Sequence, residues 1–141
     1  MAISVIAVIA VVVGFSVTTY VNARAELLDD TKALYLAEEG YELLRVLRDS
    51  DWATIDGLTI GDTYSFDVST TTIALTSTLE VIDAEFYRSF VVSEIRRDGD
   101  DDIDFSGGGT NDPDSRLVTV SVFGPTGTTS LSAVLTNINA I

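Results

Sequence analysis

The chain has 141 residues, 46% of them hydrophobic, and its 22 Asp and Glu against 8 Lys and Arg give a formal net charge of -14. This length suits one modest domain beside an N-terminal segment, and the charge disfavours binding to nucleic acid or to anionic lipid. The sequence contains no Cys and no His, which excludes disulfides, thiolate metal sites and His-based catalytic triads. Carboxylates are then the only abundant acid–base groups, and we expect no enzymatic activity.

The first segment, residues 1–23, carries no charged side chain. As a helix it is long enough to cross about 30 Å of hydrocarbon. A helix that is apolar on every side needs lipid or protein around it, so two interpretations stay open: a lasting membrane span, and a helix that starts in the membrane and later packs among copies of itself. Small and hydroxyl residues favour the packed bundle, because they allow close helix contact; they are Ser4, Gly14, Ser16, Thr18 and Thr19.

Residues 24–52 continue this helix without Pro and with strong helix formers. Apolar residues at spacings of three, four and seven predict one buried helix face; these are Leu27, Leu34, Ala37, Tyr41, Leu44 and Leu47. Gly40, inside this stretch, indicates close packing. The turn-forming residues of "RDSDW", Arg48 to Trp52, predict the end of the helix.

Residues 53–141 change to the alternation that is typical of half-buried strands. Strands are expected in "DTYSFDVS", in "TTIALTS", and over 85–97, 115–124 and 128–137, with the last two joined as a hairpin around "GPTG". The apolar faces of that hairpin can cover the helix stripe; they consist of Val118, Val120, Val122, Leu131, Ala133 and Leu135. The expected fold class is α+β, a long helical spine with an antiparallel sheet head packed on its C-terminal half.

A resemblance to a known family rests on the stretch "YLAEEGYELLRVLRDSDW", residues 35–52, which follows an uncharged helix and precedes a hairpin that ends in "LTN". This arrangement resembles the type IV pilins and pseudopilins. The resemblance implies a structural subunit of an extracellular filament of identical copies, held in the cytoplasmic membrane before the pilus assembly machinery polymerises it. Two alternatives stay open: a secretion pseudopilin or minor pilin, and a monomeric single-pass membrane protein with a small extracytoplasmic binding head.

The resemblance also implies roles for particular residues. Met1 is expected to be the processed and methylated N-terminal residue, and the filament core is expected to contain Met1, Ile3, Val5, Ile6, Ile9, Val12 and Val13. Bacterial members of the family usually have Glu at the fifth position. Val5 replaces it here, so the family's charge pairing at that position is not available.

Pilin helices often lose helical structure between a Gly and a Pro, and this chain has Gly14 but Asn22 where the Pro usually stands. The residues between them have low helix propensity. We therefore expect one continuous helix before assembly and an extended interval in the filament; the residues concerned are Gly14, Ser16, Thr18, Thr19 and Asn22.

A second notable stretch, Asp98 to Asp114, contains seven Asp and no basic residue. One interpretation is a solvated loop between two strands. The other is a calcium site, with the alternately spaced ligands Asp98, Asp100, Asp102 and Asp104. The EF-hand pattern is not met, because Ile103 occupies the position of its turn Gly.

Overall fold

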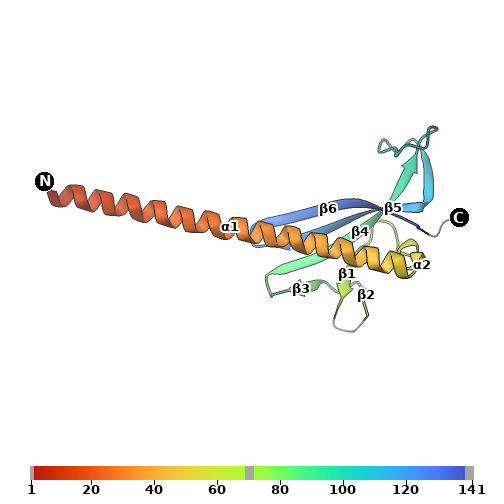
Figure 1. Cartoon of the computed structure of the whole chain (residues 1–141), viewed down its shortest axis with the longest axis horizontal. Coiled ribbons are helices and arrows are strands. Elements are labelled where there is room, and N and C mark those ends of the chain that lie inside the picture. Colours follow the sequence, from red (N-terminus) through yellow and green to blue (C-terminus); the bar gives the residue numbers. More distant parts are fainter. Residues whose placement is uncertain (1, 69–71, 139–141) are drawn as a thin grey trace.

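The computed structural model describes residues 2–68 and 72–138, with side chains described from residue 15 onward. Helix α1, Ala2–Ser50, is one unbroken helix of 49 residues, about 74 Å long at 1.5 Å per residue. Its second half lies against an antiparallel sheet, and its first half extends away from that head (Figure 1). The expected α+β class, one long helix with an antiparallel sheet packed on it, is confirmed.

A second short helix follows α1 directly. Asp51 alone interrupts the helical path, and its carboxylate accepts a hydrogen bond of 3.0 Å from the backbone N–H of Ala53, which caps helix α2, Trp52–Asp56. Ile55 of α2 is fully buried. The sequence correctly placed the end of the long helix near residue 50 but gave no sign of α2, because five residues are too few to show a helical period.

The sheet contains six antiparallel strands, β1 Thr63–Asp67, β2 Ala74–Thr76, β3 Glu80–Ile82, β4 Phe86–Arg97, β5 Thr110–Gly124 and β6 Gly127–Thr136. Their order is β2-β1-β4-β5-β6, and β3 also pairs with β4. The expected hairpin is confirmed: β5 and β6 are joined by a two-residue turn, with Gly124 paired to Gly127.

Two parts of the sheet differ from the sequence prediction. β3 was not expected, since three residues are too short to show alternation. β5 begins at Thr110 instead of Ser115, so the last part of the expected acidic loop, including Asp112 and Asp114, is strand. Long-range pairing of Thr110 with Arg97 on β4 outweighs the low strand propensity of these residues.

The core lies between α1 and the sheet. The buried side of the helix consists of Ala33, Ala37, Gly40, Leu44 and Leu47, and it faces buried side chains of the central strands, among them Phe66, Phe90, Val92, Val118, Val120, Val122 and Leu135. The close packing expected at the glycine is confirmed, because a methyl group there would lie 2.9 Å from Val120 Cγ1.

Two residues assigned to the buried helix face are wrongly placed by the sequence prediction. Leu27 is 66% exposed and Leu34 is 44% exposed. The buried positions follow a spacing of four and three residues from Ala33 onward, and this path lies about a third of a turn around the helix from Leu27 and Leu34. The two leucines therefore belong to a different surface, described next.

Candidate subunit interface

Residues 15–28 of α1 make no packing contact that covers their side chains. Every residue from 15 to 28 is exposed, including large apolar side chains: Phe15 (72%), Val17 (56%), Tyr20 (63%), Val21 (56%), Leu27 (66%) and Leu28 (67%). Burying one such side chain contributes about 1.5 to 3 kcal/mol. An uncovered row of this kind marks a surface for protein or membrane contact.

An apolar surface of α1 begins in this exposed stretch and continues beside the head. Tyr20, Leu27 and Leu34 are spaced by seven residues, and Val21, Leu28 and Tyr35 repeat the same spacing one residue later. With 3.6 residues per turn, this set lies roughly opposite the buried side that contains Ala33 and Ala37. We call these six residues the outer stripe. A seven-residue apolar repeat is typical of helices that pack along other helices.

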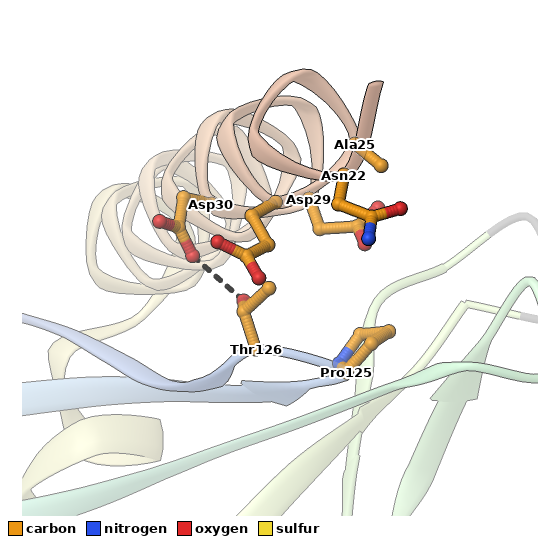
Figure 2. A pocket seen from close by; sticks show the side chains of 7 residues that line it. Asn22, Ala25, Asp29, Asp30, Pro125 and Thr126 are labelled. Atoms are coloured by element: carbon orange, nitrogen blue, oxygen red, sulfur yellow. Dashed lines mark hydrogen bonds between the residues drawn. The ribbon is translucent and has the colours of Figure 1, made fainter. Parts of the chain in front are cut away.

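Where α1 leaves the head, it forms one wall of an open cleft of about 670 Å³ whose other wall is the β5–β6 turn. Figure 2 shows Asp30 directed at this turn, where the Thr126 hydroxyl donates a hydrogen bond of 2.6 Å to Asp30 Oδ1. Asn22, Ala25 and Asp29 lie further along the helix side of the cleft (Figure 2). This hydrogen bond joins α1 to the head at Asp30, and residues 15–28, which precede it, are exposed.

A buried arginine attaches the helix to the sheet. Arg88, on β4, is 1% exposed, and its guanidinium donates to both carboxylate oxygens of Glu80 on β3, each at 2.8 Å. It also donates to the Leu36 carbonyl oxygen, at 3.0 Å, and to Glu39 Oε2, at 3.1 Å, both on α1. One side chain therefore ties α1, β3 and β4 together.

The environment of Arg88 stabilises its charged form. Burial acts to lower its pKa, but the hydrogen bonds and charges of Glu80 and then Glu39 outweigh burial, and the pKa of Arg88 is raised above its ordinary value. The guanidinium lies over the ring of Phe66, with 5.2 Å from the guanidinium carbon to the ring centre. The sequence prediction missed this group, because nothing local distinguishes Arg88 from an exposed strand arginine.

The acidic loop lies at the end of the head away from the N terminus (Figure 1). Two arginines at the end of β4 hold it closed. Arg96 donates to the carbonyl oxygens of Gly107 and Gly109, and Arg97 donates to Asp112 Oδ2 at 2.6 Å and to the carbonyl oxygen of Asp101. The loop is therefore organised by cations that flank it in the sequence.

The four proposed calcium ligands are not gathered around one point. Asp98 Oδ1 accepts backbone hydrogen bonds from Asp100 and Asp102, at 2.9 and 3.0 Å, and Asp104 accepts one from Ser106, at 2.7 Å. Hydrogen bonds from Ser106 lower the pKa of Asp104. Within residues 15–68 and 72–138, no three acidic side chains are placed to hold a metal ion together. A calcium site here stays a prediction.

Most of the residues predicted for the filament core lie at the start of α1. Met1 lies outside the described residues, and the side chains of residues 2–14 are likewise outside them; their backbone from Ala2 belongs to α1. The segment from Gly14 to Asn22 is helical, as expected for the unassembled chain. Within it, the Thr19 hydroxyl donates to the Phe15 carbonyl oxygen at 2.9 Å.

Among the described residues, one basic side chain forms no salt bridge. Seven of the 8 Lys and Arg form salt bridges within the chain, namely Lys32, Arg45, Arg48, Arg88, Arg96, Arg97 and Arg116. Among the described residues, Arg24 meets no carboxylate; its guanidinium lies over the ring of Tyr20, 5.7 Å from its centre. Arg24 therefore lies on the exposed part of α1 outside the ion pairs of the described head, two residues before Glu26.

In the part of the chain with described side chains, residues 15–68 and 72–138, no helix includes an apolar stretch long enough to span a membrane. Comparison with protein-family models, with curated proteins and with solved structures gives no match.

Proposed function

We propose that this chain is the structural subunit of a type IV pilus-like filament, which polymerises through the first half of α1 and the outer stripe. The observation that supports it best is the exposure of Leu27, Leu28 and Tyr35, at 66%, 67% and 66%: the apolar surface of the fully exposed residues 15–28 continues, at Tyr35, along the part of α1 whose other side is buried in the head. Such a helix has a second apolar surface that its own chain does not cover.

Copies of the same helix provide a suitable cover. The seven-residue repeat of the outer stripe places apolar side chains at one level after another along α1, as helix bundles require. The uncharged residues 1–23 continue this surface beyond the head, so one continuous interface extends along most of the helix. Before assembly, the same apolar segment holds the subunit in the cytoplasmic membrane, from which the assembly machinery extracts it.

The charge distribution supports helices at the centre and heads outside. A net charge of -14 makes contacts between the acidic heads unfavourable, whereas residues 1–28 carry only one positive and one negative side chain, Arg24 and Glu26. A filament with helices inside and heads on its outer surface keeps the negative charges apart and in solvent. Its surface is then the part that meets the extracellular environment.

Electron microscopy of the purified full chain tests this proposal. We expect filaments roughly 50 to 80 Å wide, from heads of about 25 Å around a helical core. Leu28→Asp and Tyr35→Asp should abolish the filaments, because each substitution places an unpaired charge in the interface, and burying such a charge costs several kcal/mol of free energy. Val5→Asp, Ile9→Asp and Val13→Asp should act in the same way at the other end of the helix.

The matched control is Phe105→Asp, which places the same charge at an apolar side chain that is 78% exposed on the acidic loop. This variant should still form filaments. The melting temperature of Leu28→Asp should equal that of the wild type, because the side chain is exposed in the single subunit. A wild-type chain that stays monomeric in detergent and after detergent removal would support a single-pass membrane protein instead.

A further inference from the structure

The sheet has one long free edge. β6 is the last strand in the order β2-β1-β4-β5-β6, and its ten residues pair with β5 in an unbroken register from Gly127 to Thr136. The opposite edge is formed by β2 and β3, of three residues each. Among the strands within residues 2–68 and 72–138, only β6 offers a long regular row of backbone groups to another chain.

The turn fixes which backbone groups of β6 point outward. Pro125 and Thr126 form a two-residue loop, so the closing pair Gly124 and Gly127 exchanges hydrogen bonds, and alternate residues from Gly127 onward do the same. The residues between them direct their N–H and C=O groups away from β5; they are Thr128, Ser130, Ser132, Val134 and Thr136. Within residues 15–68 and 72–138, these backbone groups have no strand partner.

This edge lacks the features that usually prevent strands from pairing with other molecules. Proteins protect long edges with charged residues, Pro or a bulge. β6 has none of these, and residues 117–141 contain no charged side chain in a chain whose net charge is -14. Two acidic molecules therefore meet least repulsion at this hairpin.

We propose that β6 pairs, in antiparallel orientation, with β6 of a second copy of this chain. A free edge needs an extended strand as its partner, and in another copy β6 is the one described strand that has a free edge of the same length. The side chains of its outer face also suit this contact. Ser132 and Ser130 already form hydroxyl pairs across the sheet with Thr119 and Ser121, at 2.8 and 2.9 Å, and the same hydroxyl chemistry is available across the new strand pair.

The pairing determines the direction of the two helices. A two-fold axis perpendicular to the sheet leaves both α1 helices on the same face, and antiparallel strands make their N-terminal halves extend in opposite directions, since α1 leaves the head at its β5–β6 turn end (Figure 1). Two such subunits do not belong to one filament core of single polarity. Resting on the proposed function, this contact joins filaments that run in opposite directions.

Cysteine cross-linking tests the pairing, since the chain has no native Cys. The full chain carries Leu28→Asp, which blocks contacts through the outer stripe, and is kept in detergent so that no filament is required. Single variants Thr128→Cys, Ser130→Cys, Ser132→Cys and Val134→Cys are exposed to a mild oxidant. We expect a disulfide-linked dimer at the position nearest the two-fold axis and little product at Ser121→Cys, one strand inside the edge. Absence of cross-linking at all four positions, or equal cross-linking at Ser121→Cys, would overturn the proposal.

A charge test complements it. Ser130→Lys with Ser132→Lys should raise the dissociation constant of the dimer at least about tenfold, measured by sedimentation velocity, because like charges then lie opposite each other across the strand pair. The two added lysines change the net charge from -14 to -12, so repulsion between the whole molecules is reduced and does not explain a weaker dimer. The melting temperature should not change, since both side chains are exposed.

Ser89→Lys with Ser93→Lys on β4 is the control and should dimerise normally. Equal weakening by both double variants would contradict pairing at the edge. Filaments that form normally when β6 pairing is absent would leave the proposed function intact, so the two proposals fail separately.

Discussion

Arg88 and Glu80 form a two-bond ion pair between β4 and β3, with side chains only 2% and 8% exposed. The pair is compatible with a buried position because both carboxylate oxygens of Glu80 accept a hydrogen bond, and because Arg88 also donates to Leu36 and Glu39 on α1. A buried charge that loses its partner costs far more than an exposed one. The position of the helix on the sheet therefore depends on these two side chains.

Glu80→Ala should lower the free energy of unfolding by about 3 kcal/mol, because it leaves the Arg88 guanidinium buried with only its helix partners. Urea denaturation followed by circular dichroism measures the change. Glu42→Ala is the control: Glu42 pairs with Arg45 on the exposed side of α1, at 2.7 Å, and its loss should cost under about 0.5 kcal/mol. Equal effects of the two substitutions would contradict the assignment of Arg88 as the attachment between helix and sheet.

Gly40→Ala should destabilise the head by about 1 to 3 kcal/mol, although Ala favours helix by about 1 kcal/mol over Gly. The added methyl group would lie 2.9 Å from Val120 Cγ1 and 3.1 Å from Arg88 Cδ, so α1 would have to move away from β5. Thermal unfolding measures the effect. Gly99→Ala, where nothing lies within 4 Å, should leave the melting temperature close to that of the wild type; a stabilised Gly40→Ala would show that the helix packs less closely.

The stability of the head should fall in acid partly through Asp112. Burial acts to raise the pKa of Asp112, but the hydrogen bond from Arg97 and further hydrogen bonds lower it, and the net pKa lies below the ordinary 3.8. A carboxyl with a depressed folded-state pKa contributes stability above its unfolded-state pKa and loses it as the pH falls through the folded-state value. Asp112→Asn should therefore be less stable than the wild type at pH 7, and this difference should shrink below about pH 4.

Urea unfolding of both proteins over this pH range provides the measurement. Asp62→Asn, on the exposed turn before β1, serves as the control for loss of one negative charge and should leave the free energy of unfolding at pH 7 close to that of the wild type. A difference between Asp112→Asn and wild type that is the same at pH 3 and pH 7 would show that the Arg97 contact depends on geometry alone.

Assembly should extend α1 between Gly14 and Asn22. The helix is continuous in the single chain, but this segment is rich in β-branched residues. Its helical conformation is about 4 kcal/mol less favourable than that of an alanine segment of the same length. Hydroxyls such as Thr19 are able to bond backbone groups that are released there. Each extended residue lengthens the spine by up to about 1.8 Å. A filament map that shows helical hydrogen bonds through Gly14, Thr18 and Asn22 would refute this prediction and leave the filament proposal standing.

The calcium hypothesis for the acidic loop predicts that millimolar calcium raises the melting temperature and that a chelator reverses the rise. Asp98→Asn with Asp100→Asn should remove the response. Differential scanning calorimetry with and without chelator measures it, with magnesium as the ionic control. Melting that is unchanged by calcium would leave the loop held by Arg96 and Arg97 alone.

Local patterns in the sequence were sufficient to predict the main helix and most of the long strands. The long helix, β1, β4 and the β5–β6 hairpin follow from period and turn residues, because these features depend on neighbours within a few positions. Gly40 was likewise identified as a point of close packing. The prediction failed for α2 and β3, which are too short to show a period, and for the first residues of β5, whose strand conformation comes from pairing with β4.

By itself, the sequence determined an uncharged N-terminal helix followed by an acidic α+β head. Only the tertiary structure decided which of two apolar sides of α1 is buried. Leu27 and Leu34 look equivalent to Ala37 and Leu44 in a helical period, yet the sheet covers the second pair and leaves the first pair exposed. The burial of Arg88 and the free edge of β6 were decided in the same way, because each depends on strands that are distant in the chain and meet only when the sheet has formed.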